Sequence, residues 1–196
     1  MGLIKRLLFN RYVVGWMIAD CESDALAETL IGHTCDNEGI LRNQLTLHAD
    51  RGATMRSKLV ADLLVDLGVV KSHSRPYTSD DNPFSEAQFK TMKYRPNFPE
   101  RFDSLTHARA YCQTFFSWYN YDHRHSGIGY MTPAAMHTGV APIIHAQRDQ
   151  VLQDAYAKHP NRFKNCRPVP PALPTEAGIN MPKPTSGNTN QGKIAH

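Results

Sequence analysis

The sequence predicts an α/β fold, because stretches typical of strands and of helices alternate along its first half. Residues 11–20, RYVVGWMIAD, are rich in Val, Ile and aromatic side chains and predict a buried strand. Residues 45–50, LTLHAD, alternate apolar with polar side chains, and a third strand-like run at 69–76 stops at a proline. Helical patterns separate these runs, so we expect some of the strands to pair in parallel.

The helices between the strands carry recognisable end signals. The first follows the strand at 11–20, with Ser23 as its expected N-cap. The second is an amphipathic run over 54–68, and Gly68 is its expected stop.

The second half of the chain predicts helices only. Asn82 is expected to cap a helix that has Pro83 at its first position and ends before Pro96. Further helical patterns lie at 104–122, from about 132, and at about 142–159. The last 31 residues, 166–196, hold 6 of the chain's 13 prolines and are expected to be extended or disordered.

The bulk composition leaves several function classes open and disfavours others. The 196 residues carry a net charge of +4, which permits a polyanionic partner without requiring one. The four cysteines include no CxxC pair, so we expect neither a zinc knuckle nor a redox pair, and a reducing cytoplasm is the simplest setting. No apolar run approaches the roughly 20 residues that cross a bilayer, so we expect no membrane association.

Two acids stand where an α/β fold presents functional side chains. Asp50 ends the strand at 45–50, and Glu86 lies in the first turn of the helix that begins at Pro83, with 35 residues between the two acids. Carboxylates are the hard oxygen ligands that Mg²⁺ prefers in phosphoryl-transfer sites. Each acid also has an ordinary explanation. The helix macrodipole favours an acid such as Glu86 in the first turn of a helix, and Asp is common in turns such as the one expected at residues 50–52.

Two lysines follow Glu86 on its helix. Lys90 and Lys93 lie four and seven residues after it, and therefore on the same face. This arrangement suits a metal beside a phosphate backbone, and it equally suits a plain Glu86–Lys90 surface pair.

Four motifs occur in a familiar order: RYVVGW, LHADRG, SRPYTSDDNPFSEAQFKTMKY and WYNYDHRHSGIGYMTP. Together they resemble the DDE transposases of bacterial insertion sequences, whose catalytic core is similar to that of retroviral integrases and has a ribonuclease H-like fold. The resemblance covers about residues 11–165. It implies a mixed sheet flanked by helices, a DNA transposition and integration activity, and assembly of several copies on DNA in the bacterial nucleoid.

The resemblance also implies roles for individual residues. Asp50 and Glu86 would be the second and third acids of a catalytic triad that holds two Mg²⁺ (or Mn²⁺) ions for strand transfer. Lys90 and Lys93 would lie along the DNA ends, and Asn82 would border the site. His123 and His125 would not bind metal, because that stretch packs onto the core in the family.

The chain departs from the family pattern at its start. The family's first catalytic Asp lies on a first core strand, but residues 1–10, MGLIKRLLFN, contain no acid and form an atypical start. Asp20 follows the strand at 11–20, where it is expected to be misplaced for metal binding. We therefore expect residues 11–130 to form a partial core without its first strand, followed by a helical extension at 131–165 and the proline-rich tail at 166–196.

These expectations define one main interpretation and two alternatives. The main one is the C-terminal portion of a transposase that lacks strand-transfer activity alone and binds metal weakly. The first alternative is a DNA-binding or oligomerising regulator that joins full-length transposase. The second is a ribonuclease H-like nuclease, whose cleavage would depend on Asp50.

Overall fold

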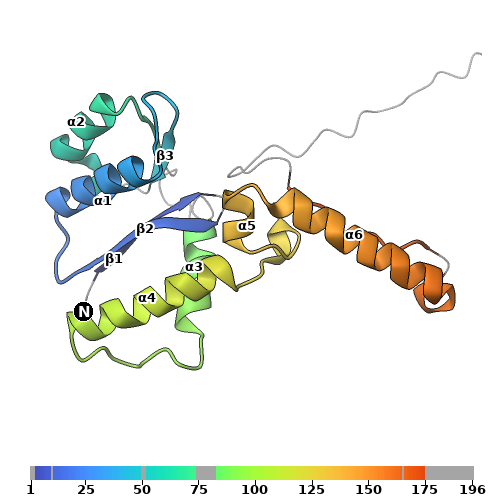
Figure 1. Ribbon diagram of the computed structural model, residues 1–196. Helices are drawn as coiled ribbons and strands as arrows, with labels where there is room; N and C mark the ends of the chain where they lie inside the picture. The colour runs from blue at the N-terminus through green and yellow to red at the C-terminus, as the bar shows by residue number, and fades with distance from the viewer. Residues whose placement is uncertain (1–2, 10, 50–51, 74–82, 165, 175–196) are drawn as a thin grey trace, which may run out of the picture.

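The computed structural model describes residues 3–9, 11–49, 52–73, 83–164 and 166–174 (Figure 1). Its strands are β1 (Leu3–Phe9), β2 (Tyr12–Ala19), β3 (Thr46–Ala49) and β4 (Val70–His73). Its α-helices are α1 (Asp24–Asn37), α2 (Lys58–Asp66), α3 (Pro83–Lys93), α4 (Leu105–Tyr121), α5 (Pro133–His137) and α6 (Ala141–Lys158). Short 3₁₀ turns η1 (Thr54–Arg56), η3 (Ser126–Ile128) and η4 (Pro160–Phe163) complete the element order.

The described strands form two separate pairs. β1 and β2 are antiparallel, from Leu3 opposite Ala19 to Phe9 opposite Tyr12, with an irregularity after Leu7. β3 and β4 are parallel, and His48 lies opposite Ser72. The predicted mixture of α and β elements with some parallel pairing is therefore confirmed.

The sequence analysis predicted no strand within residues 1–10, yet Leu3–Phe9 form β1 along β2. Lys5 and Arg6 interrupt the local apolar pattern of this segment, so only its pairing partner identifies it as a strand. β1 contains no Asp or Glu, so it does not supply the missing acid.

Hydroxyl side chains mark where α1, α2, α4 and α5 begin. Ser23, Ser57, Ser104 and Thr132 each accept a hydrogen bond from the backbone N–H three residues later. Ser23 is the predicted cap of α1, whereas the single helix predicted over 54–68 is wrong. Ser57 has extended backbone angles and starts a new helix there, so the pattern divides into η1 and α2.

Two clusters of buried side chains hold the main body together. One joins β2, α3 and α4 through Val13, Ile18, Met92, Ala108, Cys112, Phe115, Phe116 and Tyr119. The other joins α1, α2 and the start of β4 through Ala27, Ile31, Cys35, Val60, Leu64 and Val69. Figure 1 shows α1 and α2 on one side of the β1–β2 hairpin and α3 and α4 on the other.

A buried amide fastens α4 to the free edge of β2. Asn120 accepts a hydrogen bond from the backbone N–H of Val13 at 2.9 Å and donates one to the Val13 carbonyl at 3.1 Å. Both residues are buried, so Asn120 satisfies two backbone groups of β2 that no other described strand pairs with.

α6 extends away from this body (Figure 1). Residues 166–174, which we call the return segment, run back along it, and Leu173 reaches the small cluster formed by Ile128, Met131, Ala135 and Ala141. Gln153 Nε2 donates to the Pro168 carbonyl at 3.0 Å, and His145 Nε2 lies 3.2 Å from the Pro171 carbonyl. The beginning of the proline-rich tail is thus extended and attached to α6.

Among the described helices, none has the length and apolar character that a bilayer crossing requires.

Candidate functional site

The candidate site is built on α3. Glu86 lies in its first turn, and Glu86, Lys90 and Lys93 are all exposed. The opposite side of the helix is buried, since Gln88 and Met92 are 1% and 4% exposed. This amphipathic division gives α3 one surface that carries a carboxylate and two ammonium groups.

Glu86 and the two lysines are available to a ligand. Within the described part of the chain, the side chains of Glu86, Lys90 and Lys93 make no hydrogen bond or ion pair. The simple Glu86–Lys90 surface pair considered from the sequence does not form in the structure. The three charged groups therefore face solvent independently.

Asp50 and Asn82 lie outside the described residues. Their neighbours in the sequence are the last residue of β3, Ala49, and the first residue of α3, Pro83. The structure thus defines the strand that leads to one predicted site residue and the helix that follows the other.

The end of β3 is braced by contacts that the sequence analysis did not find. His48 Nδ1 lies 2.7 Å from Ser72 Oγ, directly across the β3–β4 pair. Beyond β3, Lys71 donates from Nζ to the Met55 carbonyl, and Thr54 Oγ1 donates to Glu22 Oε1 at 2.5 Å. These bonds link the segment after β3 to β4 and to the β2–α1 connection, so the region next to Asp50 is tied to two neighbouring elements.

A divalent metal fits part of this arrangement. The exposed Glu86 carboxylate offers hard oxygen ligands of the kind that Mg²⁺ binds. However, no three His, Cys, Asp or Glu side chains come together as a metal site within the described ranges. A metal site at Glu86 would therefore need further ligands from outside the described residues, and Asp50 is the one that the sequence suggests.

Asp20 has a different partner. It is exposed at the end of β2 and hydrogen-bonds the Cys21 thiol, and this bond, together with the negative charge of Asp20, raises the pKa of Cys21. The N-cap of α1 is Ser23 rather than Asp20. Asp20 thus lies exposed at the turn between β2 and α1.

The two histidines after α4 are packed among aromatic rings. His123 lies 4.6 Å from Trp118 and His125 lies 4.9 Å from Tyr119, measured between ring centroids. Burial lowers the pKa of His123, and it lowers the pKa of His125 to about 4, where His123 and Arg11 add to the effect. Both rings are therefore neutral core components at pH 7.

A polar side chain beside the site is buried without a partner. Gln88 is only 1% exposed, and neither its Nε2 nor its Oε1 has a hydrogen-bond partner among the described residues. A sequence pattern places Gln88 on the buried face but does not reveal that its amide stays unpaired, because that depends on distant neighbours.

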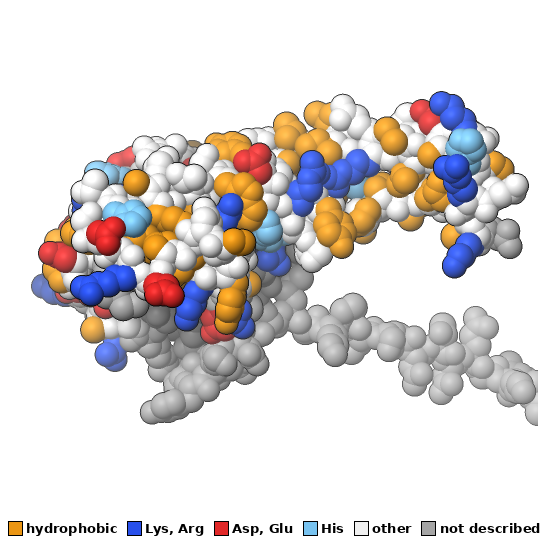
Figure 2. All heavy atoms as spheres, turned by 90° about the horizontal axis from the view of Figure 1, so that it is seen from below, with side chains coloured by type: hydrophobic (Ala, Val, Ile, Leu, Met, Phe, Trp, Pro, Cys, Tyr) orange, Lys and Arg blue, Asp and Glu red, His pale blue; other side chains and the backbone are white. Residues whose placement is uncertain are grey.

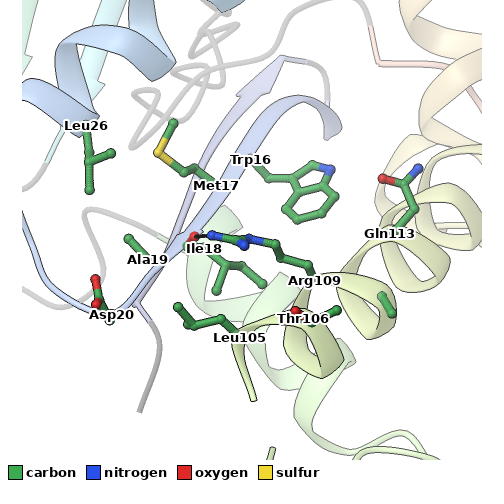
Figure 3. A pocket seen from close by; sticks show the side chains of 11 residues that line it. Trp16, Met17, Ile18, Ala19, Asp20, Leu26, Leu105, Thr106, Arg109 and Gln113 are labelled. Carbon is green, nitrogen blue, oxygen red and sulfur yellow. Dashed lines mark hydrogen bonds between the residues drawn. The ribbon is translucent and has the colours of Figure 1, made fainter.

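A separate pocket lies where β2 ends (Figure 3). It has a volume of about 810 Å³ and is lined by β2, the start of α1 and α4, with Trp16 and Leu105 among its apolar walls. Arg109 crosses its floor and donates to the Ile18 carbonyl at 3.2 Å. None of its lining residues comes from α3, so this pocket is not part of the Glu86 surface.

Comparison with known proteins agrees with this architecture. Residues 67–133, which contain β4, α3 and α4, match the integrase core domain family. The catalytic core domain of BIV integrase is similar in structure, with a TM-score of 0.55 and 17% identity, over 71% of this chain and 87% of that one. The chain therefore has the integrase catalytic-core fold, a ribonuclease H-like fold.

A second solved structure is more distantly similar. It is the simian T-cell lymphotropic virus intasome in complex with PP2A regulatory subunit B56 gamma, with a TM-score of 0.42 and 13% identity over 63% of this chain and 48% of that one. A comparison with curated proteins gave no significant match.

Proposed function

We propose that this chain is a transposase-like integrase-core protein that binds DNA through the exposed face of α3 and contributes two acids, Asp50 and Glu86, to a divalent-metal site. The observation that carries the proposal is the exposed Glu86, which has no side-chain partner among the described residues, with Lys90 and Lys93 on α3, within a segment that matches the integrase core family. The family match over residues 67–133 supports an integrase-like role, and the DNA contacts and the metal are further parts of the proposal.

Each group on α3 has a distinct role in this proposal. The lysines neutralise backbone phosphates, which is the sequence-independent part of DNA binding. Glu86 and Asp50 hold Mg²⁺ or Mn²⁺, and a bound metal supplies Lewis-acid stabilisation of a phosphoryl oxygen. Glu86 is positioned for this by the buried side of α3, because Met92 fixes the helix in the cluster with β2 and α4.

The chain is proposed to lack strand-transfer activity by itself. Two carboxylates leave a metal with fewer anionic ligands than the triad that the family resemblance implies, so binding should be weak. DNA binding needs only the lysines and is expected to survive without the third acid. The proposed role is therefore to bind DNA as one component of a larger assembly.

Two measurements on the full chain test this proposal. Fluorescence anisotropy with a labelled 30-base-pair duplex should detect binding, and Lys90→Gln/Lys93→Gln should lower the slope of log K against log salt by about 1.8, since each phosphate contact contributes about 0.9. Lys58→Gln/Arg101→Gln, which removes two exposed cations from α2 and the α3–α4 connection, is the matched control. If Lys90→Gln/Lys93→Gln leaves the salt slope unchanged, the proposed DNA interface on α3 is contradicted.

A denaturing gel in Mg²⁺ or Mn²⁺ separates this function from the nuclease alternative. The proposal predicts no cleavage of the duplex by the chain alone. Metal-dependent cleavage that disappears in Asp50→Asn would support the nuclease instead.

Association with another transposase copy is a second candidate function, which exposed apolar side chains favour. Ile143, Val151 and Val169 are 61%, 66% and 73% exposed along α6 and the return segment. Co-purification of the tagged chain with an intact transposase copy would test it. Separate elution at micromolar concentration would count against it.

A further inference from the structure

The end of α6 concentrates the positive charge of the chain. Residues 155–174 contain four Lys and Arg and no Asp or Glu. Without these four, the remaining residues carry 18 Lys and Arg against 18 Asp and Glu, so the whole net charge of +4 corresponds to this one segment. We call the four residues, Lys158, Arg162, Lys164 and Arg167, the arm tip.

The chain reversal after α6 brings the arm tip together. α6 ends at Lys158, η4 follows, and Lys164 adopts left-handed backbone angles (φ 38°, ψ 48°) that turn the chain back. Phe163 packs edge-on against Tyr156 at 5.7 Å between ring centroids, which holds η4 against the helix. Arg167 then donates from Nε to Gln153 Oε1 on α6, so three consecutive segments present cations at one end (Figure 2).

Within the described residues, the acids of α6 hydrogen-bond to glutamines and form no ion pair with the arm tip. Asp149 accepts a hydrogen bond from Gln153 Nε2 at 3.0 Å, and Asp154 accepts one from Gln150 Nε2 at 2.8 Å. Within the described residues no arm-tip cation makes an ion pair, and all four are exposed. A cation near the C-terminus of a helix interacts favourably with the helix macrodipole, which explains Lys158 in the last turn of α6. It does not explain the three cations that follow the helix.

Arg148, unlike the arm-tip cations, has a structural role. It lies nearer the body and donates to the carbonyls of Gly129 and Tyr130, each at 2.9 Å. Its guanidinium therefore fastens α6 to the turn after η3. The arm-tip cations have no such backbone partners among the described residues and remain available to a ligand.

From this charge distribution we infer that the arm tip binds backbone phosphates of duplex DNA, as a second contact beyond α3. This inference rests on the proposed function, because it takes DNA as the partner of the chain. An 18-residue helix is about 27 Å long, at about 1.5 Å per residue, so the arm reaches phosphates well away from its attachment to the body. Four exposed cations that follow the last acid of α6, Asp154, suit the phosphate charges of a duplex.

Anisotropy titrations of a labelled 30-base-pair duplex against the full chain, from 50 to 200 mM KCl with EDTA present, test the inference. Arg162→Gln/Lys164→Gln should lower the slope of log K against log salt by about 1.8, so the loss of affinity between 50 and 200 mM KCl should be about 12-fold smaller than in the wild type. Lys158→Gln/Arg167→Gln should act in the same direction. Lys58→Gln/Arg101→Gln is the control of equal charge and should leave both quantities within experimental error.

The outcomes separate this inference from the proposed function. If both arm-tip variants bind like the wild type while Lys90→Gln/Lys93→Gln binds more weakly, the arm tip is not a DNA contact and the α3 interface stands. If the wild type binds no duplex, both proposals fail. If the arm-tip variants lose affinity for poly-L-glutamate but not for DNA, the tip belongs to an acidic protein partner and the inference is overturned.

Discussion

Replacing Asn120 by Ala is expected to be among the most destabilising single changes in the body. Its amide pairs with both backbone groups of Val13 at 2.9 and 3.1 Å, and the two residues are 6% and 5% exposed. The substitution leaves a buried N–H and a buried carbonyl unpaired, and each such loss costs about 1–3 kcal/mol. We therefore expect the free energy of unfolding to fall by about 3 kcal/mol.

Chemical denaturation in urea, followed by tryptophan fluorescence, measures this loss directly. For a chain of this size, about 3 kcal/mol corresponds to a decrease of about 6–12 °C in melting temperature. Thr114→Ala on the exposed side of α4 is the matched control and should change stability by less than about 0.5 kcal/mol. A loss below about 1 kcal/mol for Asn120→Ala would refute the idea that this amide replaces a strand at the edge of β2.

Three further changes test other parts of the structure. Gln88→Met should raise the free energy of unfolding by about 1 kcal/mol in the same urea assay, because it removes two unpaired buried polar atoms; a clear loss would mean that the amide has a partner. Ser104→Ala should cost about 1 kcal/mol through loss of the α4 N-cap, and an unchanged urea midpoint would contradict that role. The lowered pKa of His125, about 4 in the folded chain against an ordinary 6.5, means that the unfolded chain binds the proton more readily. Stability should therefore decrease as the pH falls from 6.5 to 4, and His125→Phe should flatten that part of the stability–pH profile; an equally steep profile in the variant would show that other groups cause it.

Local sequence patterns predicted those helix ends that a capping or stop residue marks. Ser23 identified the start of α1, and Gly68, with φ of 62°, marks the end of the α2 segment as expected. Ser57 was missed because it lies within a continuous apolar period, where its capping role depends on its backbone angles. β1 was missed because its only strong evidence is pairing with β2.

The candidate site was predictable only in part, because some of its features depend on contacts between residues that are far apart in the sequence. The spacing of Glu86, Lys90 and Lys93 on a helix fixes a shared exposed face, and that depends on helical periodicity alone. The burial of Gln88 and the pairing of Asn120 with Val13, 107 positions away, depend on tertiary contacts that no local window contains. Asp50 and Asn82 lie outside the described residues, so their roles remain predictions.

Iron-mediated cleavage of the polypeptide is the most direct test of the proposed metal site. Fe²⁺ with ascorbate and peroxide, bound in place of Mg²⁺, generates radicals that cut the backbone close to the metal. The proposal predicts fragments that end near residues 50 and 86, suppressed by excess Mg²⁺ and lost in both Asp50→Asn and Glu86→Gln. Fragments that end elsewhere, or cuts at these positions that persist in both variants, would contradict a metal site shared by these two acids.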